Sequence, residues 1–234
     1  MTKMMRLIQK GLFLESLMPN PLKRLMGYMY LQLLHGDLAG YEWLIKTCEE
    51  EGVMKLQGDL IEVGSFVGGG TRKLSNYAKR FGKKVYAVDI FNSSADLTTC
   101  EKGVSMADIY VECSQRLGLT IFEAYWFNVG KCSNVITVRK DSKNIRFSPG
   151  RRFCFGFIDG NHSPEYVAND FYLVWNHLVH GGIVAFHDYG HDLPQVTKTI
   201  NKLIEKHKND VEKVVANPIN HTIFIKKNRV LPTF

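Results

Sequence analysis

The feature of this sequence that most constrains its fold is an alternation, from residue 58 onward, of short apolar runs with stretches of helical spacing. Short apolar runs separated by amphipathic helices are typical of a parallel sheet wound with helices. Two further runs near the end of the chain, joined by a turn that contains Pro218, predict a closing hairpin. The expected strands lie near 60–63, 84–88, 135–139, 153–158, 183–186, 212–216 and 221–226.

The chain is long enough for one large domain with an appendage. We expect that domain at residues 56–228 and a helical N-terminal extension at 1–55, broken at Pro19 and Pro21 and suited to a lid or a dimer contact. The stretch 91–134 is too long for a simple connection, so it is expected to be a helical insertion. Its helices are predicted near 104–117 and 119–129, and later helices near 164–179 and 195–208.

Every strand predicted for the parallel set is followed at once by side chains that can bind a ligand or react. Ligands of open parallel sheets lie outside the carboxyl ends of the strands, so these groups should converge on one crevice. A single polar strand end is an ordinary cap, but five in succession predict a shared site. The groups, in strand order, are Glu62, Asp89, the pair Asp141 and Ser142, Asp159, and the pair His187 and Asp188.

The glycine-rich loop that runs from Glu62 to Thr71 indicates the kind of ligand. Glycines let the backbone approach a bound molecule, and the helix that follows points free N–H groups into the site. The loop matches neither phosphate-binding pattern, because Phe66 replaces the second glycine of a dinucleotide loop and Gly70 replaces the lysine of a mononucleotide loop. A carboxylate at the next strand end, Asp89, can accept both hydroxyls of a ribose. The pattern therefore favours a nucleoside without phosphates.

Four segments resemble the class I S-adenosylmethionine-dependent methyltransferases. They are E-x-G-x-x-x-G-x-x-T from Glu62, V-Y-A-V-D ending at Asp89, F-I-D-G-N-H-S around Asp159, and L-V-H-G-G-I-V-A-F-H-D-Y ending at Tyr189. Within that family the chain is most similar to the macrocin-type sugar O-methyltransferases and, more distantly, to the catechol O-methyltransferases. The resemblance covers about residues 40–226 and implies an α/β, Rossmann-like fold with a seven-stranded, mostly parallel sheet whose last strand is antiparallel. It also implies methyl transfer to a hydroxyl of a small molecule, such as a sugar, a phenol or a polyketide-type metabolite.

The resemblance implies which part of the cofactor each polar strand end contacts. The methionine end of S-adenosylmethionine is implied to lie against Glu62, Gly64, Ser65 and Gly68. Asp89 is implied to hold the ribose, and Asp141 and Ser142 to lie beside the adenine, although a helix cap also explains the last two. Asp159 is counted with the cofactor-binding residues as well as with the catalytic ones.

Two devices are expected to make the acceptor hydroxyl nucleophilic. In metal-dependent relatives an ion is held after the fourth and fifth strands, which places Mg²⁺ or Mn²⁺ on Asp159, His187 and Asp188. His187 stands where the catechol-type pattern has a carboxylate, and imidazole favours softer ions; the alternative is that His187 only hydrogen-bonds Asp188. His162, three residues after Asp159, is expected to be the general base, because an imidazole titrates near ~6.5, or otherwise to bond the backbone at a helix start.

Composition bounds what else the chain can bind. Its 30 basic and 23 acidic side chains leave a net charge of +7 that is scattered, without a basic stripe interleaved with aromatics, so no nucleic acid partner is expected. Five cysteines without a C-x-x-C pair argue against a disulfide framework or a structural zinc site and indicate a reducing, cytoplasmic setting. No apolar run is long enough for a transmembrane segment. The expected partners are a small hydroxyl-bearing acceptor and, through the N-terminal helices, a second copy of the chain.

Two other functions fit the same scaffold. One is a metal-dependent hydroxylase of the cephalosporin-hydroxylase type, for which iron dependence and oxygen uptake are the discriminating observations. The other is a non-catalytic nucleoside-binding module, against which the acids at all five strand ends speak.

Overall fold

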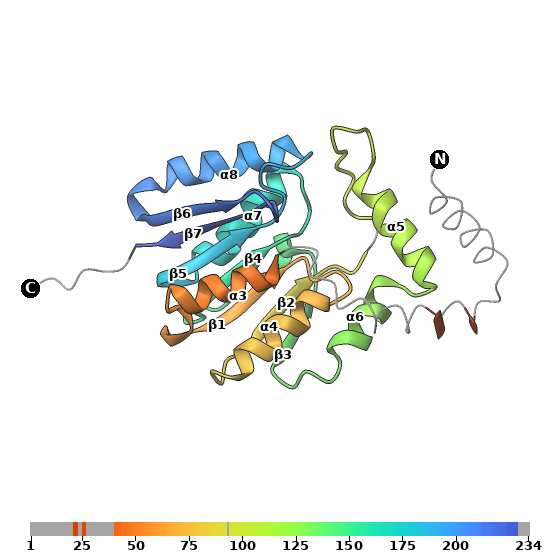
Figure 1. Cartoon of the computed structure of the whole chain (residues 1–234), viewed down its shortest axis with the longest axis horizontal. Helices are drawn as coiled ribbons and strands as arrows, with labels where there is room; N and C mark the ends of the chain where they lie inside the picture. Colours follow the sequence, from red (N-terminus) through yellow and green to blue (C-terminus); the bar gives the residue numbers. More distant parts are fainter. Residues whose placement is uncertain (1–20, 23–24, 27–39, 93, 229–234) are drawn as a thin grey trace, which may run out of the picture.

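The computed structural model describes residues 21–22, 25–26, 40–92 and 94–228. Strands and helices alternate along the chain in the order that the sequence predicts (Figure 1). The strands are β1 (Asp59–Val63), β2 (Val85–Asp89), β3 (Val135–Arg139), β4 (Phe153–Ile158), β5 (Leu178–Phe186), β6 (Val211–Asn217) and β7 (Thr222–Lys227). The α-helices from residue 40 onward are α3 (Tyr41–Glu50), α4 (Gly69–Lys79), α5 (Met106–Leu117), α6 (Ile121–Val129), α7 (Pro164–Trp175) and α8 (Pro194–Lys206). Short 3-10 turns are η1 (Val53–Lys55), η2 (Ser142–Asn144) and η3 (Lys208–Asp210).

The seven strands form one sheet in the order β3-β2-β1-β4-β5-β7-β6. Strands β1 to β5 pair in parallel, and β7 pairs antiparallel with both β5 and β6. The predicted Rossmann-like α/β fold with an antiparallel last strand is thereby confirmed. The chain runs outward from β1 to β3 and then returns to place β4 on the other side of β1. Sheets of this kind bind ligands at the carboxyl ends of the two strands where the order reverses, here β1 and β4.

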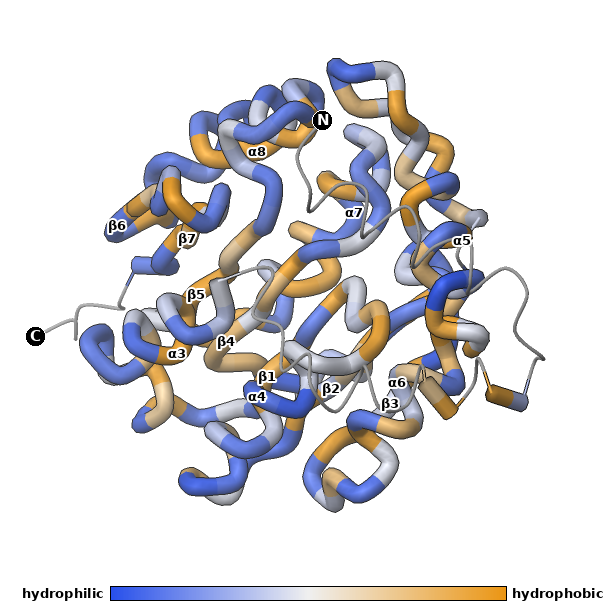
Figure 2. The backbone as a smooth tube through the Cα atoms, turned by 45° about the vertical axis from the view of Figure 1, so that its right-hand side comes forward, coloured by the Kyte–Doolittle hydropathy of each residue, from blue (hydrophilic) through white to orange (hydrophobic). Residues whose placement is uncertain are grey.

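The core lies on both faces of the sheet, because alternate side chains of each central strand point to opposite sides. In β1, Ile61 belongs to the apolar cluster that contains α7 and α8, whereas Leu60 belongs to the cluster that contains α3 and α4. Strand β5 divides in the same way, with Val184 in the first cluster and Ile183 in the second. Figure 2 shows hydrophobic segments in the inner strands and hydrophilic ones in the outer turns.

The main departure from the predicted elements lies where α7 meets β5. The apolar spacing predicts a helix over 164–179, but α7 ends at Trp175 and β5 begins at Leu178. Lys227 of β7 lies at this junction, where its Nζ donates to the carbonyl oxygens of Trp175 and Leu178, both at 3.1 Å. Gly182 lies inside the strand, where a Cβ would stand 2.9 Å from the carbonyl oxygen of Cys154 on β4.

Helices α5 and α6 lie in the predicted insertion at 91–134. A capping box starts α6, in which Glu123 N donates to Thr120 Oγ1 at 3.2 Å and Thr120 N donates to Glu123 Oε2 at 2.8 Å. Tyr125 of α6 packs in one cluster with Ala87 of β2, so this helix covers the sheet. Helix α5 stands away from the sheet in Figure 1.

Most of the predicted extension at 1–55 lies outside the described residues, and α3 is the longest part of it that the structure describes. Its roles as a lid or a dimer contact therefore stay predictions. Among the described residues, no helix combines the length and the hydropathy needed to cross a bilayer.

Candidate active site

A cleft opens at the carboxyl ends of the parallel strands, at the point where the strand order reverses. The cavity within this cleft has a volume of about 120 Å³. Residues from the ends of β1, β2 and β4 and from the start of η2 line it together. Those among them that the sequence predicts for the cofactor are Gly64, Asp89, Asp141, Ser142 and Asp159. The structure thus brings side chains from distant parts of the chain to one cleft, while their roles toward a cofactor stay predictions.

Asp89, at the end of β2, holds two loops at the cleft. Its Oδ2 accepts the backbone N–H groups of Ser65 at 2.9 Å and Phe66 at 2.8 Å, and its Oδ1 accepts that of Phe91 at 2.6 Å. Phe66 and Phe91 have φ angles of +46° and +53°, a left-handed conformation that is costly for bulky residues. Burial raises the pKa of Asp89, and the three N–H donors oppose that shift. These donors occupy about three of the roughly four lone-pair positions of a carboxylate, which leaves one for a ligand in the cleft.

The glycines of the loop after β1 make room for other parts of the protein. At Gly64, whose φ is +89°, a Cβ would overlap the backbone carbonyl of Asp159 at the end of the neighbouring strand. At Gly68, whose φ is +81°, a Cβ would lie 2.7 Å from Val129 Cγ2 of α6. Sequence reasoning explains these glycines by the approach of a ligand. The structure adds that they let the loop pack closely on β4 and α6.

Glu62 lies behind the cleft and does not line it. Its side chain is fully buried, Tyr41 Oη donates to its Oε1 at 2.8 Å, and Thr71 Oγ1 donates to its Oε2. Burial raises the pKa of Glu62 to about 7, against the effect of these hydroxyls. Ser65 and Gly68 do not line the cleft either, although Ser65 Oγ is buried without a hydrogen-bond partner. Contact of these three residues with the methionine end of a cofactor stays a prediction.

Replacing Glu62 by Gln should stabilise the protein above about pH 7 and change little below about pH 4. The folded state holds the proton of this carboxyl more tightly than the unfolded chain, because the pKa rises from 4.5 to about 7 on folding. Stability therefore falls as the pH rises through that window, by at most about 3 kcal/mol in all. Thermal unfolding of both proteins across the window measures the effect.

The exposed Glu50 of α3 supplies the control for this prediction, because Glu50→Gln changes the same groups in solvent. Its stability difference from the unmodified protein should not depend on pH. If Glu62→Gln showed an equally flat difference, the carboxyl would not be neutralised by its burial.

The other end of the cleft is built from η2 and α7. Asp141 caps η2 by accepting the N–H of Lys143 at 2.9 Å, and it also accepts the hydroxyl of Tyr166 at 2.8 Å. Ser142 is buried, and its Oγ accepts Asn169 Nδ2 at 3.3 Å. Asp141 therefore caps a turn and lines the cleft at once, so the two sequence interpretations of these residues do not exclude each other.

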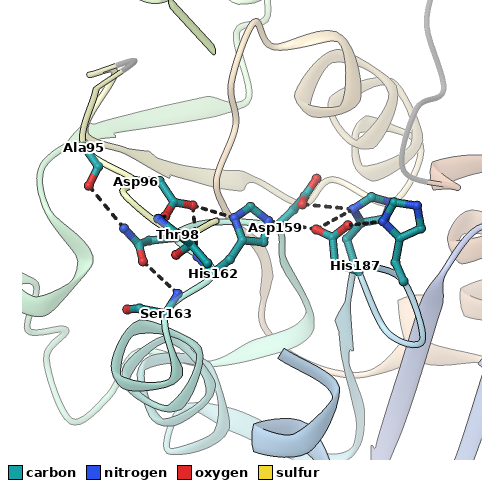
Figure 3. A network of polar contacts seen from close by, with 10 residues as sticks. Ala95, Asp96, Thr98, Asp159, His162, Ser163 and His187 are labelled. Carbon is teal, nitrogen blue, oxygen red and sulfur yellow. Dashed lines mark hydrogen bonds and ion pairs between the residues drawn. The ribbon is translucent and has the colours of Figure 1, made fainter. Parts of the chain in front are cut away.

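Two imidazoles and three carboxylates form one cluster that includes Asp159 (Figure 3). His187 Nδ1 lies 3.2 Å from Asp159 Oδ1 and 3.1 Å from Asp188 Oδ2. His162 Nε2 lies 2.8 Å from Asp188 Oδ2, and its Nδ1 lies 2.5 Å from Asp96 Oδ2. The segments that follow β2, β4 and β5 thus meet in one polar network at the edge of the cleft.

Contacts with carboxylates shift both imidazoles toward the charged form, and an ion at the cluster would take the place of the proton on a ligating ring nitrogen. Burial lowers the pKa of His162, but the hydrogen bonds to Asp188 and Asp96 outweigh burial and raise it to about 10. Burial also lowers the pKa of His187, and the charge of Asp159 raises it to about 11. Burial acts to raise the pKa of Asp188, yet the two imidazoles hold it below its usual range.

Each ring nitrogen of His162 lies against a carboxylate, Nδ1 against Asp96 and Nε2 against Asp188. The general-base role predicted for His162 stays a prediction, since a base would first have to give up the proton that it shares with one of these carboxylates. The alternative prediction, a bond from the ring to the backbone at a helix start, does not fit, since both nitrogens bond side chains.

The donor atoms of the cluster fit a divalent ion. Adjacent ligands about an ion with bonds of about 2.1 Å lie about 3 Å apart. The contacts among His162, His187, Asp159 and Asp188 measure 2.8 to 3.2 Å. One ligand atom each from Asp159, His162 and Asp188 also lie within 4.8 Å of one another. The predicted ligands Asp159, His187 and Asp188 are thus brought together, and His162 joins them as a second nitrogen donor.

Two residues of the site are not predicted from the sequence. Asp96 lies in the stretch between β2 and α5, so a rule based on strand ends cannot find it; the one local signal is an Asx turn, in which its Oδ1 accepts Thr98 N–H at 2.9 Å. Tyr110 of α5 lines the cleft with its ring centroid 5.3 Å from that of Phe66. Burial raises the pKa of Tyr110, so its hydroxyl stays protonated.

Known proteins share both the sequence pattern and the fold. A protein family described as "Methyltransferase domain" matches residues 61–189, which contain all five members of the polar cluster. No curated protein matches the chain in sequence.

Solved structures with the same fold include several methyltransferases. The O-methyltransferase NovP is 17% identical with a TM-score of 0.58, over 87% of this chain and 100% of that one. The calicheamicin methyltransferase CalS11 is 14% identical with a TM-score of 0.54, over 93% of this chain and 90% of that one. The methyltransferase PaMTH1 of Podospora anserina, bound to SAH, is 12% identical with a TM-score of 0.52, over 97% of both chains. At these identities the likeness concerns the fold.

Proposed function

The chain belongs to the methyltransferase domain family as a class I S-adenosylmethionine-dependent enzyme, and from this premise we propose that it methylates a hydroxyl of a small molecule. The observation that carries the proposal is one cleft with Asp89 at the end of β2 and Asp159 at the end of β4. The first carboxylate suits a ribose. The second borders the charged cluster, where an acceptor hydroxyl would be oriented.

For the cofactor we propose the residues that the family resemblance implies. Asp89 would accept a ribose hydroxyl with the lone pair that its three backbone donors leave open. Asp141 and Ser142 border the opposite end of the cleft, where the adenine would lie. Contact of Ser65 with the methionine end of the cofactor is proposed from the resemblance alone.

Methyl transfer from a sulfonium is an in-line displacement. The bond from sulfur to the methyl carbon breaks as the acceptor oxygen bonds to that carbon, the sulfur becomes a neutral thioether, and the hydroxyl proton passes to a neighbouring base or to water. The protein's main contribution is to hold oxygen and methyl group in line, which is worth on the order of 7 kcal/mol in favourable cases. Tyr110 and Phe66 line the cleft and limit the access of water.

We propose that Asp159 and Asp188 hold a divalent ion beside the acceptor. When bound, such an ion lowers the pKa of a hydroxyl and orients it. The nitrogen ligand that the sequence predicts is His187, which contacts both carboxylates. The class of acceptor, a sugar, a phenol or a polyketide-type metabolite, is proposed from the resemblance of the sequence.

Calorimetric titration tests the proposed function without knowledge of the acceptor. S-adenosylmethionine and S-adenosylhomocysteine should each bind the full chain at one equivalent, and NAD should give no heat. Binding of NAD with no binding of the sulfonium would contradict the proposal. Release of S-adenosylhomocysteine in the presence of a set of sugars and phenols then identifies the acceptor, whereas oxygen uptake with iron would favour the hydroxylase alternative.

A further inference from the structure

We infer that the ion site of this chain is built for a divalent transition metal, of the class of Co²⁺ and Zn²⁺, and that His162 Nε2 is one of its ligands beside Asp159 and Asp188. The inference rests on the proposed function, because the ion would serve the same cleft. It goes beyond that function by naming the class of ion and a nitrogen ligand that the sequence does not predict.

The first support is the way His162 is held from behind. Metal-binding histidines generally donate their other ring N–H to a carboxylate, which fixes the orientation of the ring. Here Nδ1 lies 2.5 Å from Asp96 Oδ2, and the same oxygen accepts the backbone N–H of His162 at 3.1 Å. The other oxygen of Asp96 is held by the backbone N–H of Thr98. The ring cannot turn without breaking this arrangement, so Nε2 is kept toward Asp188.

The second support is the difference in burial between the two histidines that could supply a nitrogen ligand. His162 is only 4% exposed, and Asp96 and Asp188 are buried with it. The side chain of His187 is 20% exposed, and among the described residues no group bonds its Nε2. His162 is therefore buried and held in one orientation, as metal-binding histidines generally are. His187 is suited to be an additional nitrogen donor at the open side of the cluster.

The third support is the chemistry of the donor set. Mg²⁺ and Mn²⁺ prefer oxygen ligands, and Mg²⁺ keeps several waters, whereas imidazole suits ions such as Fe²⁺ and Zn²⁺. Two carboxylates with one or two imidazoles therefore favour one of these later ions. Both imidazoles contact Asp188, His162 at 2.8 Å and His187 at 3.1 Å, so an ion bound to this carboxylate would have a nitrogen donor beside it.

Metal titration of the full chain, after treatment with a chelator, tests the inference with the ions alone. Co²⁺ and Zn²⁺ should bind at least about tenfold more tightly than Mg²⁺, and bound Co²⁺ should show a changed visible absorption spectrum because of its nitrogen ligand. His162→Gln should weaken Co²⁺ binding at least about tenfold and change Mg²⁺ binding little. Asp96→Asn should weaken Co²⁺ binding about tenfold, the effect expected of a residue that orients a ligand.

The controls separate this inference from folding and from the proposed function. His177 is a half-buried histidine just before β5, at the amino ends of the strands. His177→Gln should leave Co²⁺ binding unchanged. Each variant is also titrated with S-adenosylhomocysteine, whose binding reports an intact cleft; should His162→Gln fail to fold, Asp96→Asn carries the test. Equal affinities for Mg²⁺ and Co²⁺, or a His162→Gln variant that keeps its Co²⁺ affinity, overturns the inference. Absence of cofactor binding in the unmodified chain overturns the proposed function instead.

Discussion

Replacing Asp89 by Ala is expected to lower the affinity for S-adenosylmethionine at least about 100-fold. The factor requires ~2.8 kcal/mol, which lies within the about 1.5–3 kcal/mol that a hydrogen bond from one ribose hydroxyl to a charged group contributes. The variant also removes the acceptor of the N–H groups of Ser65, Phe66 and Phe91, so the two loops beside the cleft lose the group that holds them. Calorimetry measures the affinity, and circular dichroism shows whether the variant is folded at the same temperature.

Two acidic residues elsewhere on the sheet are matched controls for this prediction. Asp59 is the first residue of β1, so it lies at the amino ends of the strands, away from the cleft. Its Oδ1 accepts Lys84 N–H at 3.0 Å, and Asp59→Ala should leave cofactor affinity unchanged. Asp188→Asn should change it no more than a few-fold, because the ion-pair contacts of Asp188 are to histidines, His162, His187 and His191. Equal loss in the variants of Asp89 and Asp188 would show that cofactor and ion sites are not divided as proposed.

The fold is predictable from the sequence because its signals are local and periodic. Short apolar runs place the strands, and the rule that sequential parallel strands are joined by helices supplies most of the topology. The boundary between α7 and β5 is not predictable in this way. The contacts at this boundary are long-range: Lys227, a residue about fifty positions later, donates from Nζ to the carbonyl oxygens of Trp175 and Leu178, and no local pattern shows that contact.

The side-chain period of a strand explains why Glu62 differs from the other polar strand ends. Residues two apart share a face, so Glu62 points to the same side as Leu60, toward α3 and α4. Its carboxyl therefore bonds Tyr41 of α3. Asp89 and Asp159 escape this constraint because each stands at or beyond the last residue of its strand, where the side chain is free to border the cleft.

The contacts within the polar cluster cannot be predicted from the sequence for a different reason. Asp96 reaches His162 only because the insertion between β2 and β3 folds back over the end of β4. No periodic pattern encodes that path, since loop conformations depend on contacts made elsewhere. The sequence therefore predicts which strands end in side chains that can bind a ligand. It does not predict which imidazole lies between two carboxylates.

Replacing Gly64 by Ala is expected to destabilise the protein by more than about 4 kcal/mol, a loss large enough to unfold many domains. The φ of +89° is unfavourable for alanine, and the added Cβ would overlap the backbone carbonyl of Asp159. Neither backbone can move freely, because Gly64 N donates to Val88 O at 2.9 Å and Asp159 N donates to Val63 O at 2.8 Å. Urea denaturation of the two proteins measures the difference.

Gly82→Ala separates the two causes of this loss. Gly82 has a φ of +64°, but a Cβ there meets nothing within 4 Å, so the variant carries the backbone strain without the overlap. Its cost should be only about 1–2 kcal/mol. The difference between the two variants then measures the close approach of β1 and β4 beneath the cleft. If Gly64→Ala were no more costly than Gly82→Ala, the strand ends would be free to separate, and the glycine would be needed for the ligand alone.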